Sequence, residues 1–378
     1  MPHTVKNKQG RFFGTSAPSD AQGRTEDPRT DGRNLRLMQD AGLNMVRVEL
    51  HFPFDTPQMD TPSAAFRRDV EIMTAYRAAG MTVLAIAQMP GSFRSNGTGS
   101  VAFQSTYPAW MGAFEEDGYY EKLAAGWEWA ARQCAGLIEW WQIGNEPDFT
   151  IFRGSLSHEQ NVRWLNTVTD AIKKGNPTAQ CGVSIAAFEL ETSTFGIQGY
   201  TQTLLATLYG KSTRYDYVGI DGYFGTWCEG GPEDWGAYID AAHRATRRPV
   251  IIQEWGYASR QRGAPRSEEE KRRRFNSPVC KEKDWDAIGP VKWLGQDHSE
   301  AMQADFIKRC LEVFDQKTCV IGTLFFYWKD APFCWQCKAA DCPAETAWGV
   351  VRSDGSTKPG YDALAKYGKR LPRSIGQA

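Results

Sequence analysis

Eight short apolar runs alternate with amphipathic stretches along this 378-residue chain, and this repeat restricts the folds open to it. The runs are rich in Val, Ile, Leu and Phe without strict polar alternation, as in strands buried on both faces of a parallel sheet. We predict strands at 11–17, 43–50, 81–88, 138–146, 180–187, 215–223, 249–255 and 320–328. We predict helices at about 29–41, 64–79, 119–135, 157–174, 199–209, 233–246, 299–316 and 360–369.

Eight βα units in order, with no break in composition, predict an α/β protein with one closed (β/α)8 TIM barrel over residues 1–378. The stretches 89–118 and 256–298 predict extended βα loops, the second a long insertion after the seventh strand. A doubly wound open sheet is the alternative. It would normally carry a glycine-rich phosphate loop after its first strand, and 14–18 (GTSAP) is not one. The stretch 97–102 resembles a dinucleotide fingerprint but lies about ten residues past its strand, so we interpret it as loop.

Charge and hydropathy exclude several classes of partner. The chain has 44 basic and 45 acidic residues and a net charge of −1, so no overall field favours nucleic acid or an anionic membrane. No apolar run approaches the roughly 18 residues that span a bilayer. The first residues have no apolar segment typical of a signal peptide. We expect a monomer without a cofactor or a bound metal.

Nine cysteines bear on the compartment. Four of them fall in predicted helices or strands and are interpreted as small buried apolar residues: Cys134, Cys181, Cys310 and Cys319. The other five fall in predicted loops: Cys228, Cys280, Cys334, Cys337 and Cys342. Disulfides, a structural zinc site and free thiols all remain open for the loop cysteines, and disulfides are favoured. Disulfides favour an extracellular or secreted protein whose signal has been removed, and a cytoplasmic location remains possible.

Two glutamates close predicted strands, and both are followed or preceded by aromatic residues. Glu146 ends the fourth strand in Trp-Trp-Gln-Ile-Gly-Asn-Glu-Pro, and Glu254 ends the seventh before Trp255. In a barrel the ends of these strands face each other across the C-terminal opening, where active sites are built. Two carboxylates that face each other suit glycosidic bond cleavage, in which one protonates the leaving oxygen and the other attacks or activates water. The abundance of tryptophan, 14 residues, agrees with sugar binding as well as with a large core.

These residues resemble the retaining glycoside hydrolases of clan A, which includes families 5 and 39. Asn145-Glu146-Pro147 is similar to the clan's Asn-Glu-Pro signature, and Glu254 before Trp255-Gly256 is similar to its nucleophile strand. The resemblance implies that Glu146 is the acid/base and Glu254 the nucleophile. It also implies substrate-binding or supporting roles for four neighbours: Arg47, Asn145, Tyr223 and Trp328. The tail 348–364 is similar to the clan's closing strand and helix, so the resemblance runs from about residue 11 to 370.

Four further residues are candidates for substrate contacts. Many family 5 members have a histidine after strand three, where this chain has Gln88, and His-x-Tyr on strand six, where it has Asp221-Gly222-Tyr223. Gln88 and Asp221 are therefore expected to bind sugar hydroxyls. His51, after the second strand, and Trp255 complete the expected substrate-binding set.

The expected chemistry follows from the surroundings of the two carboxyl groups. Arg47 beside Glu254 would lower the pKa of that carboxyl and keep it a nucleophile. Glu146, in a partly apolar pocket facing a carboxylate, would have a raised pKa and remain an acid. We predict carboxyl groups about 5–5.5 Å apart, the retaining spacing. The function expected is cleavage of β-linked oligo- or polysaccharides through a covalent glycosyl-enzyme, with the sugar and the choice of exo or endo action left open.

Three other classes of protein are alternatives to a retaining glycosidase, and the sequence supports each of them less well. A metal-dependent barrel hydrolase is an alternative, although five histidines and no His-x-His make a ligand set hard to assemble. A catalytically silent carbohydrate-binding barrel is another, although both carboxylates are present. A Ser-His-Asp hydrolase is excluded because the chain has no Gly-x-Ser-x-Gly elbow.

Overall fold

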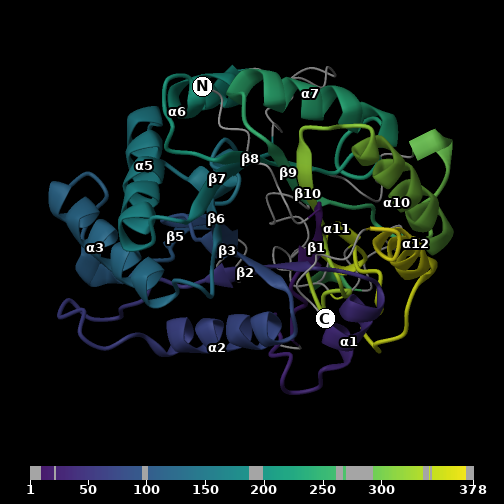
Figure 1. Cartoon of the computed structure of the whole chain (residues 1–378), viewed down its shortest axis with the longest axis horizontal. Helices are drawn as coiled ribbons and strands as arrows, with labels where there is room; N and C mark the ends of the chain where they lie inside the picture. The colour runs from purple at the N-terminus through teal and green to yellow at the C-terminus, as the bar shows by residue number, and fades with distance from the viewer. Residues whose placement is uncertain are drawn as a thin grey trace.

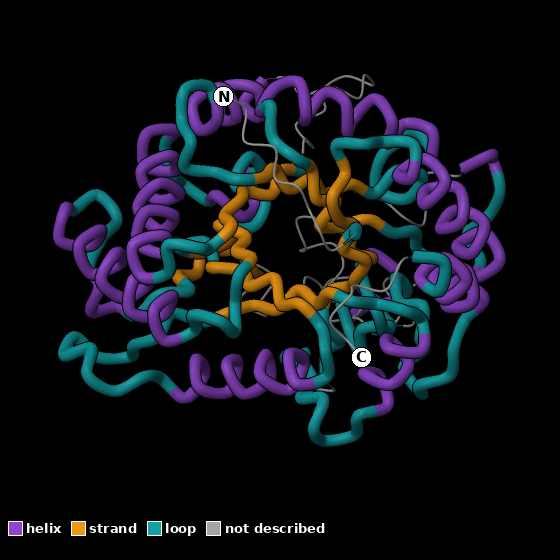
Figure 2. Tube along the Cα trace, viewed as in Figure 1, coloured by secondary structure: helices purple, strands orange, loops and turns teal. Residues whose placement is uncertain are grey.

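A computed structural model describes residues 10–20, 23–95, 101–186, 199–260, 267–269, 293–334, 340 and 343–371. Eight parallel strands form a closed barrel in the order β1-β10-β9-β8-β7-β6-β3-β2. The strands are β1 (Phe12–Ser16), β2 (Met45–Leu50), β3 (Thr82–Ala87), β6 (Trp140–Ile143), β7 (Gln180–Ile185), β8 (Tyr217–Gly222), β9 (Val250–Trp255) and β10 (Val320–Phe325). Figure 2 shows the strands as a closed ring with the helices outside it. The predicted (β/α)8 barrel is confirmed.

The helices follow the strands as predicted and cover the outside of the barrel (Figure 1). They are α1 (Arg33–Asp40), α2 (Ala64–Ala78), α3 (Asp117–Gln133), α5 (His158–Gly175), α6 (Gly199–Tyr209), α7 (Trp235–Thr246), α10 (Glu300–Asp315) and α12 (Pro359–Gly368). The start of α5 shows why a boundary can be predicted. The Gln160 N–H donates to Ser157 Oγ, and the Ser157 N–H donates to Gln160 Oε1. This capping box satisfies two N–H groups that the first helical turn leaves without partners.

Several short elements were not predicted. A two-stranded antiparallel sheet of β4 (Gly91–Ser95) and β5 (Val101–Ser105) lies within the stretch expected to be loop. The residues between these strands, which include Gly97 and Gly99, lie outside the described residues. The other additions are α4 (Thr150–Arg153), α11 (Pro343–Thr346), η1 (Ala109–Met111), η2 (Pro232–Asp234) and η3 (Trp293–Gly295). Most of the predicted insertion at 256–298 also lies outside the described residues.

Two layers of apolar side chains hold the barrel together. A large outer layer fills the space between strands and helices. A smaller cluster fills the barrel interior, with Phe12, Met45, Leu84, Trp140, Tyr217, Ile251 and Leu324. The interior below the C-terminal opening is therefore a packed core and not a channel, which places any site at the strand ends.

A register shift in β9 decides which of its residues face the barrel interior. Ile251 belongs to the interior cluster, and Gln253 donates to Tyr217 Oη at 3.1 Å inside the barrel. Simple alternation would then point Trp255 inward. The pairing of β9 with β8 shifts by one residue just before Glu254, so Glu254 faces the opening and Trp255 packs outward. A bulge of this kind re-aims a side chain at the end of a strand.

A buried ion pair holds the closing segment of the chain. Lys358, which is 2% exposed, donates from Nζ to Asp330 Oδ1 at 2.7 Å and to Ser259 Oγ at 2.8 Å. Burial lowers the pKa of Lys358 and raises the pKa of Asp330, although each partner opposes the shift of the other. Both charges are thus partly desolvated, and each depends on the other.

We expect Lys358→Met to lower the free energy of unfolding by about 3–5 kcal/mol, because it leaves the Asp330 charge buried without its partner. Urea denaturation measures this loss. Lys366→Met, at an exposed position on α12, is the control and should change stability by less than about 0.5 kcal/mol. The double variant with Asp330→Asn should lose less than Lys358→Met alone. A loss as small as that of the control would show that the pair contributes little.

The cysteine prediction is only partly tested. Cys134, Cys181 and Cys310 are buried as expected, and burial raises the pKa of each thiol. Cys319, which was also expected to be buried, is half-buried. No disulfide joins two cysteines of the described residues. Three of the five loop cysteines lie outside those residues, so the disulfide and zinc hypotheses stay predictions. In the described part of the chain, no helix is both long and apolar enough to cross a bilayer.

Candidate active site

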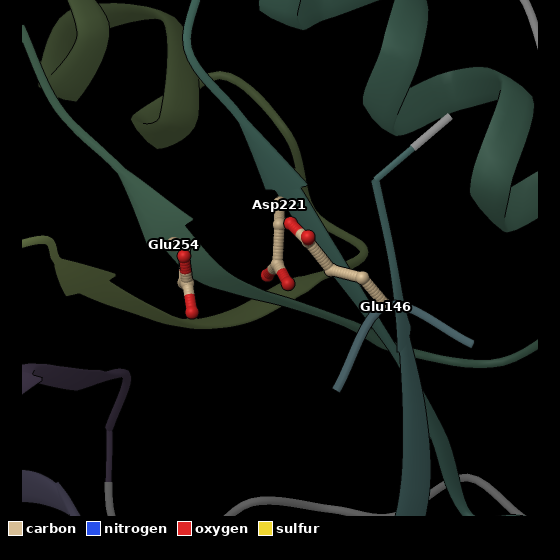
Figure 3. Close-up of side chains that lie close together, drawn as sticks. All are labelled: Glu146, Asp221 and Glu254. Atoms are coloured by element: carbon tan, nitrogen blue, oxygen red, sulfur yellow. The ribbon is translucent and has the colours of Figure 1, made fainter. Parts of the chain in front are cut away.

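Three carboxylates meet at the C-terminal opening of the barrel. Glu146 follows β6, Asp221 lies near the end of β8 and Glu254 near the end of β9. One carboxylate oxygen from each lies within 4.8 Å of the others, and all three residues are buried. Figure 3 shows Asp221 between the two glutamates, with the Glu146 side chain extended toward it. The two glutamates predicted from the strand ends are therefore brought together, and Asp221 joins them.

Arg47, on β2, is the cation that organises this cluster. Its Nη1 lies 2.6 Å from Glu254 Oε1 and 3.3 Å from Ser16 Oγ. Its Nε donates to Gln142 Oε1 at 2.7 Å, and its Nη2 donates to Asn145 Oδ1 at 2.6 Å. All three nitrogens of the guanidinium thus donate to protein groups. This fixes Glu254 and Asn145 relative to each other before any ligand enters.

Glu146 has an unusual backbone conformation. Its φ is 43°, in the left-handed region that residues other than glycine seldom adopt. The Glu146 N–H donates to Ser184 Oγ at 3.1 Å, and its carbonyl accepts from the Phe149 N–H at 2.8 Å. Such conformations cost of order 1–3 kcal/mol and cluster at functional sites. These two hydrogen bonds hold the backbone that turns the Glu146 side chain toward Asp221.

An aromatic wall lines one side of the cluster. Tyr223 donates its hydroxyl to Glu254 Oε2, the contact that the resemblance implies. Tyr223 packs with Phe326 and Trp348, and the partly buried Trp227 and Tyr327 pack against them. Tyr223, Phe326 and Trp348 are buried, so Trp227 and Tyr327 are the rings of this wall that are partly exposed.

The two acids that lack a close cation have strongly shifted pKa values. Burial raises the pKa of Glu146 well above its usual range, and the charges of Asp221 and Glu254 raise it further against the effect of Arg47. Burial also raises the pKa of Asp221, with the Glu254 charge next in size. Asp221 is fully buried, and a hydrogen bond with Ser184 opposes the rise in its pKa only in part. The cluster therefore favours protons on Glu146 and Asp221, while Glu254 is paired with Arg47.

Two of the predicted substrate-binding tryptophans do not reach this site. Trp255 is fully buried and packs its ring edge-on against Phe314 of α10 and against Phe325. Trp328 is fully buried and packs against Tyr361 of α12. Both rings lie in the outer layer between strands and helices, so their positions contradict the predicted sugar contacts. The register shift in β9 explains why Trp255 points outward, away from the opening.

His51 is also held away from the cluster. Its ring Nδ1 lies 2.7 Å from Asp69 Oδ2 on α2, and its backbone N–H donates to the same oxygen at 2.8 Å. The hydrogen bond with Asp69 is the main cause of the raised pKa of His51. The described contacts give His51 a role in joining β2 to α2 and none with the three acids.

Gln88 does lie at the opening, together with a residue that the sequence analysis missed. Its Nε2 donates to Glu49 Oε2 at 3.1 Å. Glu49 is exposed and lies two residues after Arg47 on β2, whereas Val48 and Leu50 are buried in the outer layer. Alternation along the strand therefore places Glu49 on the same inward side as Arg47. A second charged residue, two positions after Arg47 on the same strand, is the signal that could have identified it.

Gln142 and Ser184 are further supporting residues that were not predicted. Gln142 is fully buried, and its Nε2 lies 3.0 Å from the acceptors Asn145 Oδ1 and Ser184 Oγ. It therefore links the contacts of Arg47 to those of Glu146. Gln142 lies four residues before Glu146 inside an apolar strand, and an isolated amide there indicates a polar network.

The acid cluster also meets the requirements of a cation site in part. Carboxylate oxygens are suitable ligands for hard divalent ions, and Glu146, Asp221 and Glu254 could each supply one. The Arg47 guanidinium already bonds to Glu254, and its charge opposes a second cation. Loss of activity on chelation would be the observation that favours a metal-dependent barrel hydrolase.

No protein-family model matches the chain, and no curated protein sequence matches it either. Solved structures do match. They include the β-D-glucuronidase of Dictyoglomus thermophilum, with 14% identity, a TM-score of 0.59 and coverage of 98% of this chain and 52% of that one. A Ruminococcus gnavus β-glucuronidase matches with 14% identity, a TM-score of 0.59 and coverage of 97% and 53%. A GH2 β-galacturonidase of Eisenbergiella tayi, solved with galacturonate, matches with 14% identity, a TM-score of 0.59 and coverage of 97% and 52%.

The similarity to these solved structures shows that the chain shares their barrel fold. The chain spans about half the length of these three structures. At 14% identity they confirm the barrel, and none of the three is named as a member of family 5 or 39.

Proposed function

We propose that this protein is a retaining β-glycoside hydrolase, with Glu254 as nucleophile and Glu146 as acid/base. The observation that carries the proposal is the close approach of these two buried carboxylates, whose nearest oxygens lie within 4.8 Å. Retaining glycosidases hold their carboxyl groups about 5–5.5 Å apart, whereas inverting enzymes leave about 6.5–9.5 Å for a water molecule. The names of the structural neighbours, β-glucuronidases and a β-galacturonidase, agree with a glycosidase.

The different surroundings of the two acids support different roles. Glu254 accepts hydrogen bonds from Arg47 and Tyr223, which orient its carboxylate for attack on the anomeric carbon. The raised pKa of Glu146 keeps a proton on that carboxyl for transfer to the leaving oxygen. Once the glycosyl ester forms, the Glu254 charge is gone, and Glu146 can ionise and accept a proton from water.

Asn145 supports substrate binding in this scheme. Its Oδ1 accepts from Arg47 and Gln142, which fixes the orientation of the amide. Its Nδ2 is thereby aimed away from those donors and is suited to a sugar hydroxyl. A hydrogen bond to the 2-hydroxyl would strengthen as the oxocarbenium-like transition state forms.

The test is hydrolysis of a panel of aryl β-glycosides and polysaccharides, with the anomeric configuration of the first product followed by NMR. We expect release of the aryl group with net retention. Net inversion would replace the covalent mechanism by a single displacement, and absence of hydrolysis combined with measurable glycan binding would favour a silent carbohydrate-binding barrel.

Asp221 should set the pH range of this activity. When Asp221 loses its proton at rising pH, its charge adds to burial in raising the pKa of Glu146, and Asp221→Asn, which cannot gain that charge, lowers that pKa. The alkaline limb of kcat/KM, which reports loss of the proton from the acid, should then move to lower pH. Full pH profiles of wild type and variant measure the shift. The variant leaves unchanged the other ionisable groups that interact with Glu146 or Asp221: Arg47, Asp148, Tyr223, Tyr238 and Glu254.

Glu312→Gln is the control for that profile. It removes one carboxylate from an exposed position on α10 and should leave the alkaline limb in place. If Asp221→Asn also leaves it in place, Asp221 carries its own proton throughout the working range and has no influence on Glu146.

A further inference from the structure

The charge around the opening restricts the sugars that can enter. Four acids of the described residues face this opening: Glu49, Glu146, Asp221 and Glu254. Arg47 is the cation that the described contacts place among them. Because each of its three nitrogens donates to the protein, Arg47 has little capacity left to bind a carboxylate of a substrate.

Glu49 is the acid of this group that a ligand can reach. Its side chain is exposed. By contrast, Glu146 is 4% exposed, Glu254 is 7% exposed and Asp221 is fully buried. Its Oε2 is oriented by the Gln88 amide, which leaves Oε1 and the remaining lone pairs as acceptors. Burial raises the pKa of Tyr327, whose ring packs against the aromatic wall, and the charges of Glu345, Glu254 and Glu49 raise it further. Glu49 therefore lies on the same opening as the proposed nucleophile.

Oriented carboxylate and amide oxygens accept hydrogen bonds and repel anions. Carboxylate acceptors bind hydroxyl and ammonium groups well, because a charged acceptor strengthens the bond. A carboxylate on the sugar would meet Glu49 as a like charge beside the negative charge of Glu254, without a described cation free to compensate. Like charges placed against each other discriminate strongly between ligands.

We propose that Glu49 and Gln88 form a subsite that selects glycosides bearing hydroxyl or ammonium groups and rejects uronides. This rests on the proposed glycosidase function and specifies its substrate class. It also separates this chain from its structural neighbours, whose names include β-glucuronidases and a β-galacturonidase.

The experiment compares matched aryl glycosides that differ only in charge: β-glucoside with β-glucosaminide and β-glucuronide, and β-galactoside with β-galacturonide. We expect kcat/KM for each uronide to be at least about 10²-fold below that of its neutral partner, given the repulsion between like charges. Glu49→Gln should reduce this preference by about tenfold, because neutral hydrogen bonds are weaker than charge-assisted ones. Glu49→Lys should reduce it further, and Glu312→Gln should leave it unchanged.

Binding of the same compounds to Glu146→Gln, measured by calorimetry, separates this inference from the proposed function. Preferential binding of neutral or amino glycosides without turnover by wild type would contradict the glycosidase and support the subsite. A uronide that is hydrolysed or bound as well as its neutral partner would overturn the inference alone. If both Glu49 variants keep the preference for neutral glycosides, Glu49 is not part of the subsite. If no compound binds, both proposals are overturned.

Discussion

Glu254→Gln is expected to abolish turnover, with kcat on the order of 10⁴-fold or more below wild type. The amide cannot form the glycosyl ester, and it replaces the carboxylate that Arg47 and Tyr223 hold in place. The loss should be similar for substrates with good and poor leaving groups, because attack on the anomeric carbon precedes every product. Steady-state hydrolysis of dinitrophenyl and methyl glycosides measures both cases.

Covalent labelling is the direct check on that role. A 2-deoxy-2-fluoro glycoside with a good leaving group should form a stable ester, and mass spectrometry of the digested protein should place the label on Glu254. Glu312→Gln should label as wild type does. Label on another residue, or turnover of Glu254→Gln within about tenfold of wild type, would contradict the assignment.

Glu146→Gln should have an effect that depends on the leaving group. For alkyl glycosides and oligosaccharides, loss of the general acid is expected to lower kcat/KM by about 10²–10⁴-fold. For dinitrophenyl glycosides the leaving group needs no proton, so kcat/KM should fall little. Hydrolysis of the ester would still lack its base, so we expect a burst of dinitrophenol followed by slow turnover.

Azide gives this prediction a second readout. As an anion that needs no deprotonation, it should attack the ester in Glu146→Gln, raise the slow rate and yield a β-glycosyl azide. Wild type should show no such acceleration. Equal losses for good and poor leaving groups, or no rescue by azide, would mean that Glu146 is not the acid/base.

The fold could be predicted because each part of the pattern has a local cause. Strands buried on both faces leave continuous apolar runs, and the capping box at Ser157 and Gln160 marks the start of α5 through contacts within four residues. The hairpin of β4 and β5 could not be predicted, because its serines and glycines favour turns and its strands form through pairing with each other.

Part of the site could be predicted, namely the residues whose place follows from a strand end or from the family resemblance. Glu146 and Glu254 follow from the ends of strands, whereas Arg47 and Tyr223 follow from the resemblance, and the structure places all four in one network. The predicted sugar contacts of Trp255 and Trp328 were wrong. Trp255 ends β9 and Trp328 follows β10, and at such positions a shift of one residue decides whether a side chain faces the opening or the outer layer. Gln142 was missed although it interrupts an apolar strand, and Glu49 was missed although it lies on the same side of its strand as Arg47 by simple alternation.

The shifted pairing in β9 has a consequence for how such a protein could change over time. If the shift were lost and Gln253 paired with Asp221 of β8 in regular register, every residue of the strand would be kept. The carboxylate would then point among the surrounding helices, and the indole of Trp255 would occupy the opening. That exchange would place a carboxylate in the apolar outer layer and separate it from Arg47 and Tyr223. It would therefore cost both the stability of the barrel and the proposed chemistry, so one position in the backbone couples the two.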